Sequence, residues 1–406
     1  MRTGDIKKLF ARVYILLKSI LKITIKKQRE HESGVSTNLI IFTGLLGDAV
    51  FVIEPLRRLR QHYKIRDEDV VIATRSAPAE FMRLIDGLSG VKFYEVDFKR
   101  YCEDIGYFNN FNRQYLKTAY NDIIIFQQSR TASVMNFNSN GRRRIQVWDD
   151  VPRGAWRLIN RINRRHLTDV VVTGGFDCLI NRYSRTSDIV TEENSKVINP
   201  KIEWNTFVCD TELSGKCFLQ NPFVVISPFS SSDIRNLADV KLRSVMGFIL
   251  NCGYNIAVSV LSDRINDAKH IINGLPPDKV KIFGNTSLTE WISLIRSAEF
   301  LIGMDSASIH IASAVGTQAF CCLSGKDDEN IYPYRGESVE GTCQPILIKT
   351  KRKECFGCFI KGNVEGYGNV ECRKMIKSTG TVLCMSELTA EEIIFKIKEY
   401  LRCEKG

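Results

Sequence analysis

Long hydrophobic runs are missing from this chain, since no uninterrupted apolar segment reaches the ~20 residues that a helix needs to cross a bilayer. Cysteine is too sparse, at 13 in 406 residues, for a secreted scaffold held together by disulfides. The sequence also contains no short-period repeat and no low-complexity tract. These absences argue against a membrane-spanning protein and exclude a disulfide-rich fold and a repeat solenoid.

Two common nucleotide-binding motifs are missing as well. The segment NLIIF predicts a buried strand, and the turn TGLLGD that follows it places Gly44, Gly47 and Asp48 before an amphipathic helix. The turn is not G-x-G-x-x-G, which excludes the dinucleotide fingerprint, and no G-K-[ST] follows, which excludes a P-loop. Asp48 at such a turn is either a helix cap or a general base.

The composition is that of a globular protein, with 44% apolar and 25% charged residues, and the length predicts two or three domains. The net charge of +11 is unevenly placed. Residues 1–35 carry nine Lys and Arg against three Asp and Glu, residues 36–200 carry 24 against 19, and residues 201–406 carry 24 of each. The first half therefore predicts an acidic partner, such as nucleic acid, an anionic membrane or a phosphorylated substrate.

Residues 6–27 predict a basic amphipathic helix. One side gathers Ile6, Leu9, Val13, Leu16, Leu17 and Ile20, and the other gathers Lys8, Arg12, Lys18, Lys22 and Lys26, with Ile15 as the exception. This pattern is typical of a helix that lies in the headgroup plane of a membrane, and the alternative is a helix packed on its own domain or a partner. A signal peptide is not expected, because basic residues interrupt the apolar side and no cleavage site follows.

Short aliphatic strands alternate with helices along the rest of the chain, which predicts α/β domains with parallel sheets covered on both faces. The predicted organisation is an N-terminal helix (1–35), a first domain (36–205), a second domain (206–385) and a C-terminal helix (386–406). Two such domains in series predict a bilobed enzyme, with its site in the cleft between them, beyond the carboxyl ends of the strands.

Two strand ends in the second half carry polar motifs. The strand EFLIGM runs into Asp305, Ser306 and Ala307, where a helix begins and its free amides can bind a phosphate. The strand before SPFSSSDIRNL runs into Ser230, Ser231 and Arg235, whose guanidinium can bind a diphosphate. The alternatives are an ordinary helix cap and a solvated loop.

The order and spacing of these motifs resemble those of glycosyltransferase family nine, the heptosyltransferase-like enzymes of lipopolysaccharide biosynthesis. The resemblance rests on the LGD turn and on SLTEWISLIRSAEFLIGMDSASIHIASAVGT, and it covers roughly residues 36–402. The matching positions of the later segment are Ser287, Leu288, Glu290, Leu294, Ile295, Ala298, Gly303, Asp305, Ser306, His310, Ile311, Ala312, Ala314, Gly316 and Thr317.

The resemblance implies two Rossmann-like domains facing each other, the GT-B architecture. It implies an inverting, metal-independent transfer of a sugar from a nucleotide diphospho-sugar, usually ADP-heptose, to a lipopolysaccharide or other surface-glycan acceptor, with no cofactor required. Asp48 matches the candidate catalytic base. On the donor side, Asp305, Ser306 and Ala307 match the pyrophosphate-binding helix start, Arg235 falls near a basic residue that neutralises the diphosphate, and Asp263, with Asp267 as its rival, is the candidate ribose-binding acid.

Two departures from the family pattern motivate a second hypothesis. Ala307 replaces the usual Gly, and the loop SSSDIRNL lacks the common Lys-x-Trp-Pro. The alternative is a non-catalytic sugar-nucleotide-binding or scaffolding protein of the same fold, although the retention of Asp48 and Asp305 favours an enzyme. His310 is interpreted as a packed residue that hydrogen-bonds within the fold.

Cysteines near the C-terminus have the spacing Cys355-x-x-Cys358, followed by Cys372 and Cys384. Four thiolates can form a tetrahedral structural zinc site, and the alternatives are free thiols and disulfides. A third hypothesis is a zinc-stabilised nucleic-acid binder. No recognised nucleic-acid module is present, so a nucleic-acid partner is not predicted.

The leading prediction is a cytoplasmic glycosyltransferase, peripherally attached to the inner face of a bacterial inner membrane. Its predicted partners are the nucleotide-sugar donor, a phosphorylated glycolipid acceptor and anionic lipid. The candidate acceptor contacts, for which a solvated surface is the alternative, are Arg142, Arg143, Arg144, Arg153, Arg157, Arg161, Arg164 and Arg165.

Overall fold

The computed structural model describes residues 3–26, 37–63, 69–149, 157–173, 178–203, 222–232, 235–325, 331–349, 375–376 and 381–404. The chain divides into two compact units, Met1–Val197 (unit 1) and Ile198–Gly406 (unit 2). The sequence analysis places this boundary after residue 205. In the structure the Asn199 amide already bonds to the Glu337 carbonyl (2.9 Å) and the Ile202 amide to the Ala314 carbonyl (3.0 Å), so these residues pack with unit 2.

Unit 1 is built on a six-stranded parallel sheet in the order β3-β2-β1-β4-β5-β6. Its strands are β1 (Asn38–Ile41), β2 (Val70–Thr74), β3 (Lys92–Glu95), β4 (Ala119–Ile125), β5 (Asn140–Asp149) and β6 (Asp169–Thr173). Strands β1 and β2 are buried over their whole length. This is why they read as continuous aliphatic runs rather than as alternating ones.

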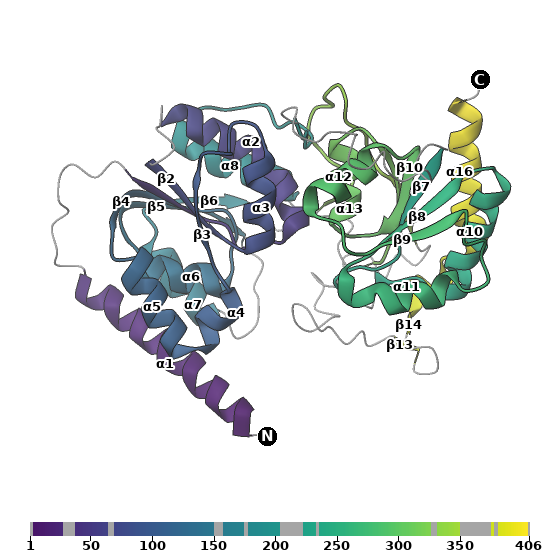
Figure 1. Cartoon of the computed structure of the whole chain (residues 1–406). Helices are drawn as coiled ribbons and strands as arrows, with labels where there is room; N and C mark the ends of the chain where they lie inside the picture. The colour runs from purple at the N-terminus through teal and green to yellow at the C-terminus, as the bar shows by residue number, and fades with distance from the viewer. Residues whose placement is uncertain are drawn as a thin grey trace. The chain divides into compact units, whose positions relative to one another are not determined.

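Helices cover both faces of this sheet (Figure 1). One face carries α2 (Leu46–His62), α3 (Ser76–Leu84) and α8 (Leu179–Thr191). The other carries α1 (Thr3–Lys26), α4 (Phe98–Glu103), α5 (Ile105–Tyr115), α6 (Arg130–Asn138) and α7 (Arg157–His166). No helix among the described residues, α1 included, is long and apolar enough to cross a membrane.

Unit 2 repeats the plan with a second six-stranded parallel sheet, in the order β9-β8-β7-β10-β11-β12. Its strands are β7 (Phe223–Ser227), β8 (Asn255–Ser259), β9 (Val280–Phe283), β10 (Phe300–Met304), β11 (Gln318–Leu323) and β12 (Ile346–Lys349). Counted within each unit, both sheets have the order 3-2-1-4-5-6 of the dinucleotide-binding fold. The predicted class of two Rossmann-like α/β units is confirmed.

The helices of unit 2 again form two layers (Figure 1). One face carries α12 (Leu288–Arg296) and α13 (Ala307–Ala314), and the other carries α10 (Asp239–Asn251), α11 (Ile265–Ile272) and α16 (Ala390–Glu404). The shorter elements are the 3-10 turn η5 (Ser262–Arg264), α15 (Leu383–Glu387) and the antiparallel pair β13 (Met375–Ile376) and β14 (Thr381–Val382). Residues from α10, α11, α15 and α16 form one apolar core with the strands.

Candidate functional site

The sheet of unit 2 reverses its order between β7 and β10, because β8 lies beside β7 on one side and β10 lies on the other. Doubly wound sheets bind ligands beyond the carboxyl ends of the strands at such a point. The loop after β7 holds Ser230, Ser231 and Arg235, and the turn after β10 holds Asp305 and Ser306. Both predicted donor-side motifs therefore meet at this edge.

An ion pair joins the two motifs. Arg235 Nη1 donates to Asp305 Oδ2 at 2.8 Å and to the Asp305 carbonyl at 2.9 Å. The two side chains are only 15% and 4% exposed, so water screens their attraction much less than it would screen a surface pair. The sequence predicts separate roles for the two residues, whereas the structure shows that Asp305 holds Arg235 in place.

The Arg235 guanidinium keeps donors for a ligand. Its Nε atom is buried without a hydrogen-bond partner in the described part of the chain, and its Nη2 approaches Ser231 Oγ only to 3.5 Å. A buried N–H group without an acceptor costs about 1–3 kcal/mol. An anionic oxygen placed against this edge of the guanidinium would remove that cost.

A cluster of three buried rings, His310, Tyr332 and Tyr334, lies behind the ion pair. The Tyr332 hydroxyl donates to Asp305 Oδ1 at 3.0 Å, and the Tyr334 hydroxyl lies 2.8 Å from His310 Nδ1. Asp305 thus has one oxygen held by Arg235 and the other by Tyr332. Tyr332 is not among the residues predicted from the sequence, where it belongs to a Tyr-Pro-Tyr triplet outside the recognised motifs.

Burial lowers the pKa of His310 to about 4; nearby Asp305 raises this pKa and Arg235 lowers it. The imidazole is therefore neutral at pH 7 and adds no charge to the site. Burial also raises the pKa values of Tyr332 and Tyr334 well above their usual range, so both hydroxyls keep their protons. His310 lies packed inside the fold, in line with its interpretation from the sequence.

Helix α13 begins directly beside this cluster. Ser306 occupies the N-cap position, but its hydroxyl pairs with the Ser308 hydroxyl (2.8 Å) and does not cap the helix. The Asp305 carboxylate is turned toward Arg235 and Tyr332. No side-chain cap forms within the described residues, so the first-turn amides, with Ala307 at the first helical position, retain their capacity to bind an anion.

The other predicted donor-side residues are a serine that stabilises its own loop and two candidate ribose-binding acids. Ser230 shapes its own loop, because its hydroxyl accepts the Ser232 amide and donates to the Ser232 carbonyl, both at 3.1 Å. Asp267 pairs with Arg264 at 2.7 Å. Asp263, in η5 after β8, is exposed and forms no ion pair or hydrogen bond with any described residue. Its carboxylate is therefore the more accessible of the two candidate acids.

In unit 1 the predicted turn follows β1, again at the point where the sheet reverses its order. Asp48 lies in the first turn of α2, and its Oδ2 accepts the Leu45 amide at 2.8 Å, which fixes the carboxylate. A Cβ atom on Gly44 would lie 2.5 Å from Phe42 Cζ and 2.8 Å from Asp48 Cβ, so the turn accepts only glycine there without moving Asp48. Gly47 lies inside the same first turn.

Arg75 is a further residue of this edge that the sequence analysis misses. It follows β2 directly, and its guanidinium lies 5.1 Å from the Phe98 ring. Burial lowers the pKa of Arg75, while the Asp97 and Asp48 carboxylates raise it. Its Nε is buried without a partner among the described residues, so Arg75 places a positive group with an open donor near Asp48. A charged residue directly after a buried strand is the signal that could have found it.

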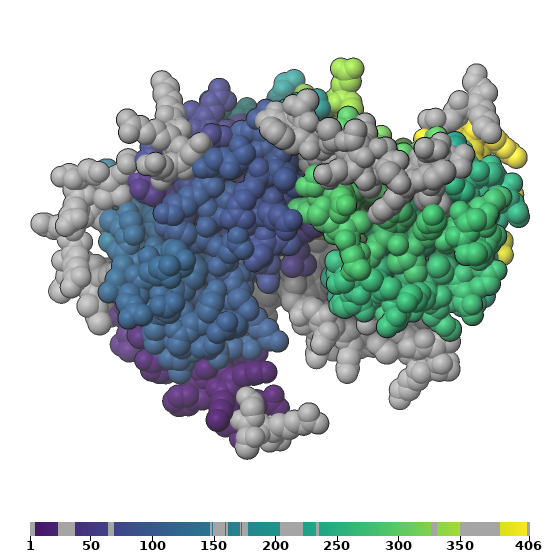
Figure 2. All heavy atoms as spheres, in the orientation of Figure 1, coloured from purple at the N-terminus to yellow at the C-terminus, as the bar shows by residue number. Residues whose placement is uncertain are grey.

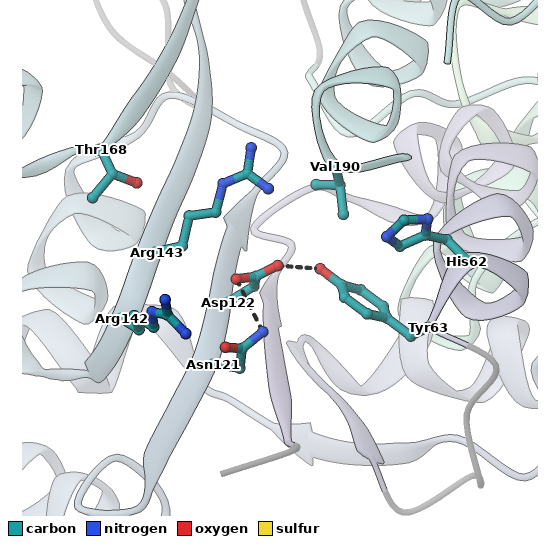
Figure 3. Close-up of a pocket in the computed structure, with 8 residues that line it drawn as sticks. All are labelled: His62, Tyr63, Asn121, Asp122, Arg142, Arg143, Thr168 and Val190. Atoms are coloured by element: carbon teal, nitrogen blue, oxygen red, sulfur yellow. Dashed lines mark hydrogen bonds between the residues drawn. The ribbon is translucent and has the colours of Figure 1, made fainter. Parts of the chain in front are cut away.

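A separate pocket of about 450 Å³ opens at the opposite, amino-terminal edge of the unit 1 sheet. Figure 3 shows its lining residues, His62, Tyr63, Asn121, Asp122, Arg142, Arg143, Thr168 and Val190. Two of its charged groups are already engaged, since the Tyr63 hydroxyl donates to Asp122 (2.5 Å) and Arg143 forms a two-pronged ion pair with Asp169 (2.9 and 3.1 Å). Arg144, on the same strand, is buried and bonds to the carbonyls of Asn136 and Ser139. Arg143 and Arg144 are thus both held by protein groups, and their assignment as acceptor contacts stays a prediction.

The described residues contain no group of three or more His, Cys, Asp or Glu that could hold a metal ion. Three members of the predicted zinc set, Cys355, Cys358 and Cys372, lie outside the described residues, as does Arg153. The fourth, Cys384, is buried in the apolar core of unit 2. The zinc site stays a prediction.

Two Rossmann-like units define an α/β fold, and unit 2 places a buried arginine beside an uncapped helix start. A model of glycosyltransferase family 9 (heptosyltransferase) matches residues 112–354, which is more than half of the chain. The chain belongs to this family and is a glycosyltransferase, as the resemblance predicts. Comparison with curated proteins gave no match.

Solved structures share the fold at low sequence identity. A family 9 glycosyltransferase from Veillonella parvula has a TM-score of 0.66 and 14% identity over 93% of this chain and 100% of its own. Heptosyltransferase WaaC of E. coli, with ADP-2-deoxy-2-fluoro heptose, has a TM-score of 0.60 and 14% identity over 90% of this chain and 99% of its own. The iron-containing heptosyltransferase TibC of enterotoxigenic E. coli, with ADP-D-beta-D-heptose, has a TM-score of 0.52 and 13% identity over 93% of this chain and 81% of its own.

The buried imidazole predicts a loss of stability in acid. The pKa of His310 is about 4 in the folded chain and about 6.5 in an unfolded one, so the unfolded chain binds the extra proton between these values. The stability of unit 2 should be complete above pH 6.5 and should fall toward pH 4, by up to about 3 kcal/mol from this residue. The free energy of unfolding of wild type and of His310→Gln, measured with denaturant across this pH range, tests the prediction. If the free energies of both proteins fall by the same amount toward pH 4, the prediction is wrong.

The bond from Tyr332 to Asp305 predicts a role in ligand binding. Tyr332→Phe removes the hydroxyl that holds Asp305, which loosens Arg235, and should weaken binding of a nucleoside diphosphate roughly fivefold to tenfold. Tyr334→Phe is the matched control, because its hydroxyl bonds to His310 instead. Calorimetric titration with ADP measures both; equal losses in the two variants would show that the rings matter only for packing.

Proposed function

We propose that this glycosyltransferase moves a heptose or a related sugar from a nucleoside diphosphate donor, with ADP-heptose as the first candidate, to a phosphorylated surface glycan. The observation that carries the proposal is the buried Arg235–Asp305 pair beside the uncapped start of α13. Two solved relatives are described with ADP-heptose or its fluoro analogue, which supports the choice of donor.

The departing group would be stabilised on unit 2. As the bond between the sugar C1 and the diphosphate oxygen breaks, the diphosphate gains negative charge and the sugar takes on oxocarbenium character. The Arg235 guanidinium and the first-turn amides of α13 are fixed in place before the reaction, so they stabilise this charge without rearrangement. On this proposal the chain's own groups do this work and no metal is required. The Asp263 carboxylate is the candidate acceptor for a ribose hydroxyl.

The attack would be assisted from unit 1. An acceptor hydroxyl forms a bond to C1 on the face opposite the diphosphate, and its proton passes to the Asp48 carboxylate, so the anomeric configuration inverts. The Leu45 amide holds that carboxylate in one orientation, which suits a general base. Unit 1 carries 33 Lys and Arg against 22 Asp and Glu, whereas unit 2 carries 24 of each. The positive excess favours unit 1 as the side that receives a phosphorylated acceptor, at the cytoplasmic face of the inner membrane.

Asp48→Asn should lower the rate of sugar transfer about 10²–10⁴-fold, while donor binding stays intact. Asp104→Asn is the matched control, because Asp104 also bonds to an amide at a helix start in unit 1. A thermal-shift panel of ADP-, GDP-, UDP- and CDP-sugars identifies the donor, and product analysis then measures transfer. Unchanged transfer by Asp48→Asn would remove Asp48 from the mechanism. Donor binding with no transfer by the wild type would favour the sugar-nucleotide-binding alternative.

The four cysteines are proposed to hold a structural metal. Four thiolates suit tetrahedral zinc or iron, and one solved relative is described as iron-containing. Purified protein should contain about one metal ion per chain, zinc or iron, and Cys358→Ser should lower this content and the melting temperature. Cys252→Ser is the control, because Cys252 is exposed and does not belong to the four-cysteine motif. Metal analysis that finds neither ion, or the same content in both variants, would contradict the proposal.

A further inference from the structure

Helix α1 exposes a continuous apolar surface. Seven of its large hydrophobic side chains are between 38% and 67% exposed. These residues, here called the apolar arc, are Ile6, Leu9, Phe10, Val13, Tyr14, Leu17 and Leu21. Their spacing of three and four residues places them on one side of the helix, over about 22 Å from end to end.

The apolar arc stands apart from the other exposed hydrophobic residues. Elsewhere in the described chain, large exposed apolar side chains occur on separate elements, at Leu45, Val172, Val240, Leu261 and Phe395. Single exposed residues of this kind are ordinary, whereas a contiguous patch marks an interaction surface. In Figure 2 the purple atoms of α1 form part of the surface of unit 1, next to the blue atoms of its other helices.

The opposite side of α1 is anchored on unit 1. Ala11, Ile15 and Ser19 are buried against it, and Ile15 belongs to the apolar core. Arg12 pairs with Glu103, Lys18 bonds to Asn109 (2.8 Å), and Lys22 bonds to the Asn138 carbonyl (2.7 Å). The apolar arc therefore cannot turn inward without breaking these bonds and exposing Ile15.

This arrangement differs from the sequence expectation. The helical wheel predicts a helix in the headgroup plane of a membrane, with the basic residues opposite the apolar side and Ile15 as the exception, and packing on its own domain or a partner is the alternative. In the structure Ile15 marks the side that packs on the protein, and Arg12, Lys18 and Lys22 bind protein groups. Lys7 remains exposed, and the Lys18 ammonium lies 5.7 Å from the Tyr14 ring, at the border of the apolar arc.

We infer that the apolar arc inserts into the headgroup region of an anionic lipid surface and so holds unit 1 on the membrane. The positive charge of the N-terminal segment favours anionic lipid over a second copy of the chain as the binding partner. Residues 1–35 carry a net charge of +6, so two copies of the arc would bring like charges together, whereas anionic lipid attracts the same residues. The tyrosine ring at the border suits the interface between hydrocarbon and water.

Insertion of the apolar side chains should supply most of the free energy of membrane binding, because three of the helix's basic side chains are already bound to the protein. High salt should therefore weaken the attachment without abolishing it. The attachment is a property of unit 1 alone and is independent of the donor and of sugar transfer. It extends the proposed function, since it would bring the enzyme to a glycolipid acceptor.

Co-sedimentation of the full chain with vesicles of phosphatidylethanolamine and phosphatidylglycerol tests the inference. Wild type should sediment with the vesicles, and the Phe10→Ser, Leu17→Ser double variant should lose at least about tenfold in affinity. The matched control is Phe395→Ser, Val240→Ser, which removes exposed apolar side chains from two helices of unit 2. All four residues are exposed, so the melting temperatures should be unchanged.

Three results would overturn the inference. The first is a wild type that stays in the supernatant. The second is an equal affinity for vesicles in the two double variants. The third is a wild-type dimer in sedimentation equilibrium that the Phe10→Ser, Leu17→Ser variant dissociates, with no vesicle binding by either protein, which would assign the apolar arc to a second copy of the chain.

Discussion

The proposed donor site depends on the buried ion pair between Arg235 and Asp305. It joins the loop after β7 to the turn after β10, at the point where the sheet of unit 2 reverses its order. Removing either partner would leave a buried charge without compensation, which is costly. The Tyr332 hydroxyl completes the environment of Asp305, so Asp305 serves as a scaffold for the guanidinium. The Nε of this arginine has no partner among the described residues, and we propose that this group meets the ligand.

The two units share a strand order and differ in charge. Unit 2 is neutral overall, with 24 Lys and Arg against 24 Asp and Glu, and it places one buried arginine beside one uncapped helix start. Unit 1 carries the whole excess of +11 together with the exposed apolar arc of α1. We propose that the same fold serves a small, negatively charged donor in unit 2 and a lipid surface with its glycan in unit 1.

Much of the fold was predictable because buried parallel strands are nearly pure aliphatic runs, as in β1 and β7. Strand β5 was not predictable in this way, because three arginines lie near its start. Only the tertiary structure shows that Arg144 is buried and donates hydrogen bonds to backbone carbonyls. Asp305 and Arg235 could be found from their place after strands, but their pairing spans 70 positions and Tyr332 joins from 27 positions away. Periodicity found the two sides of α1 but could not tell which side packs, since one buried residue, Ile15, decides it.

We propose that Arg235, held by Asp305, binds the diphosphate of the donor. Calorimetric titration of wild type and Arg235→Met with ADP and with AMP tests it most directly, because the two nucleotides differ by the second phosphate. Wild type should bind ADP at least about tenfold more tightly than AMP, and Arg235→Met should lose most of this preference. An unchanged preference for ADP in Arg235→Met would contradict it.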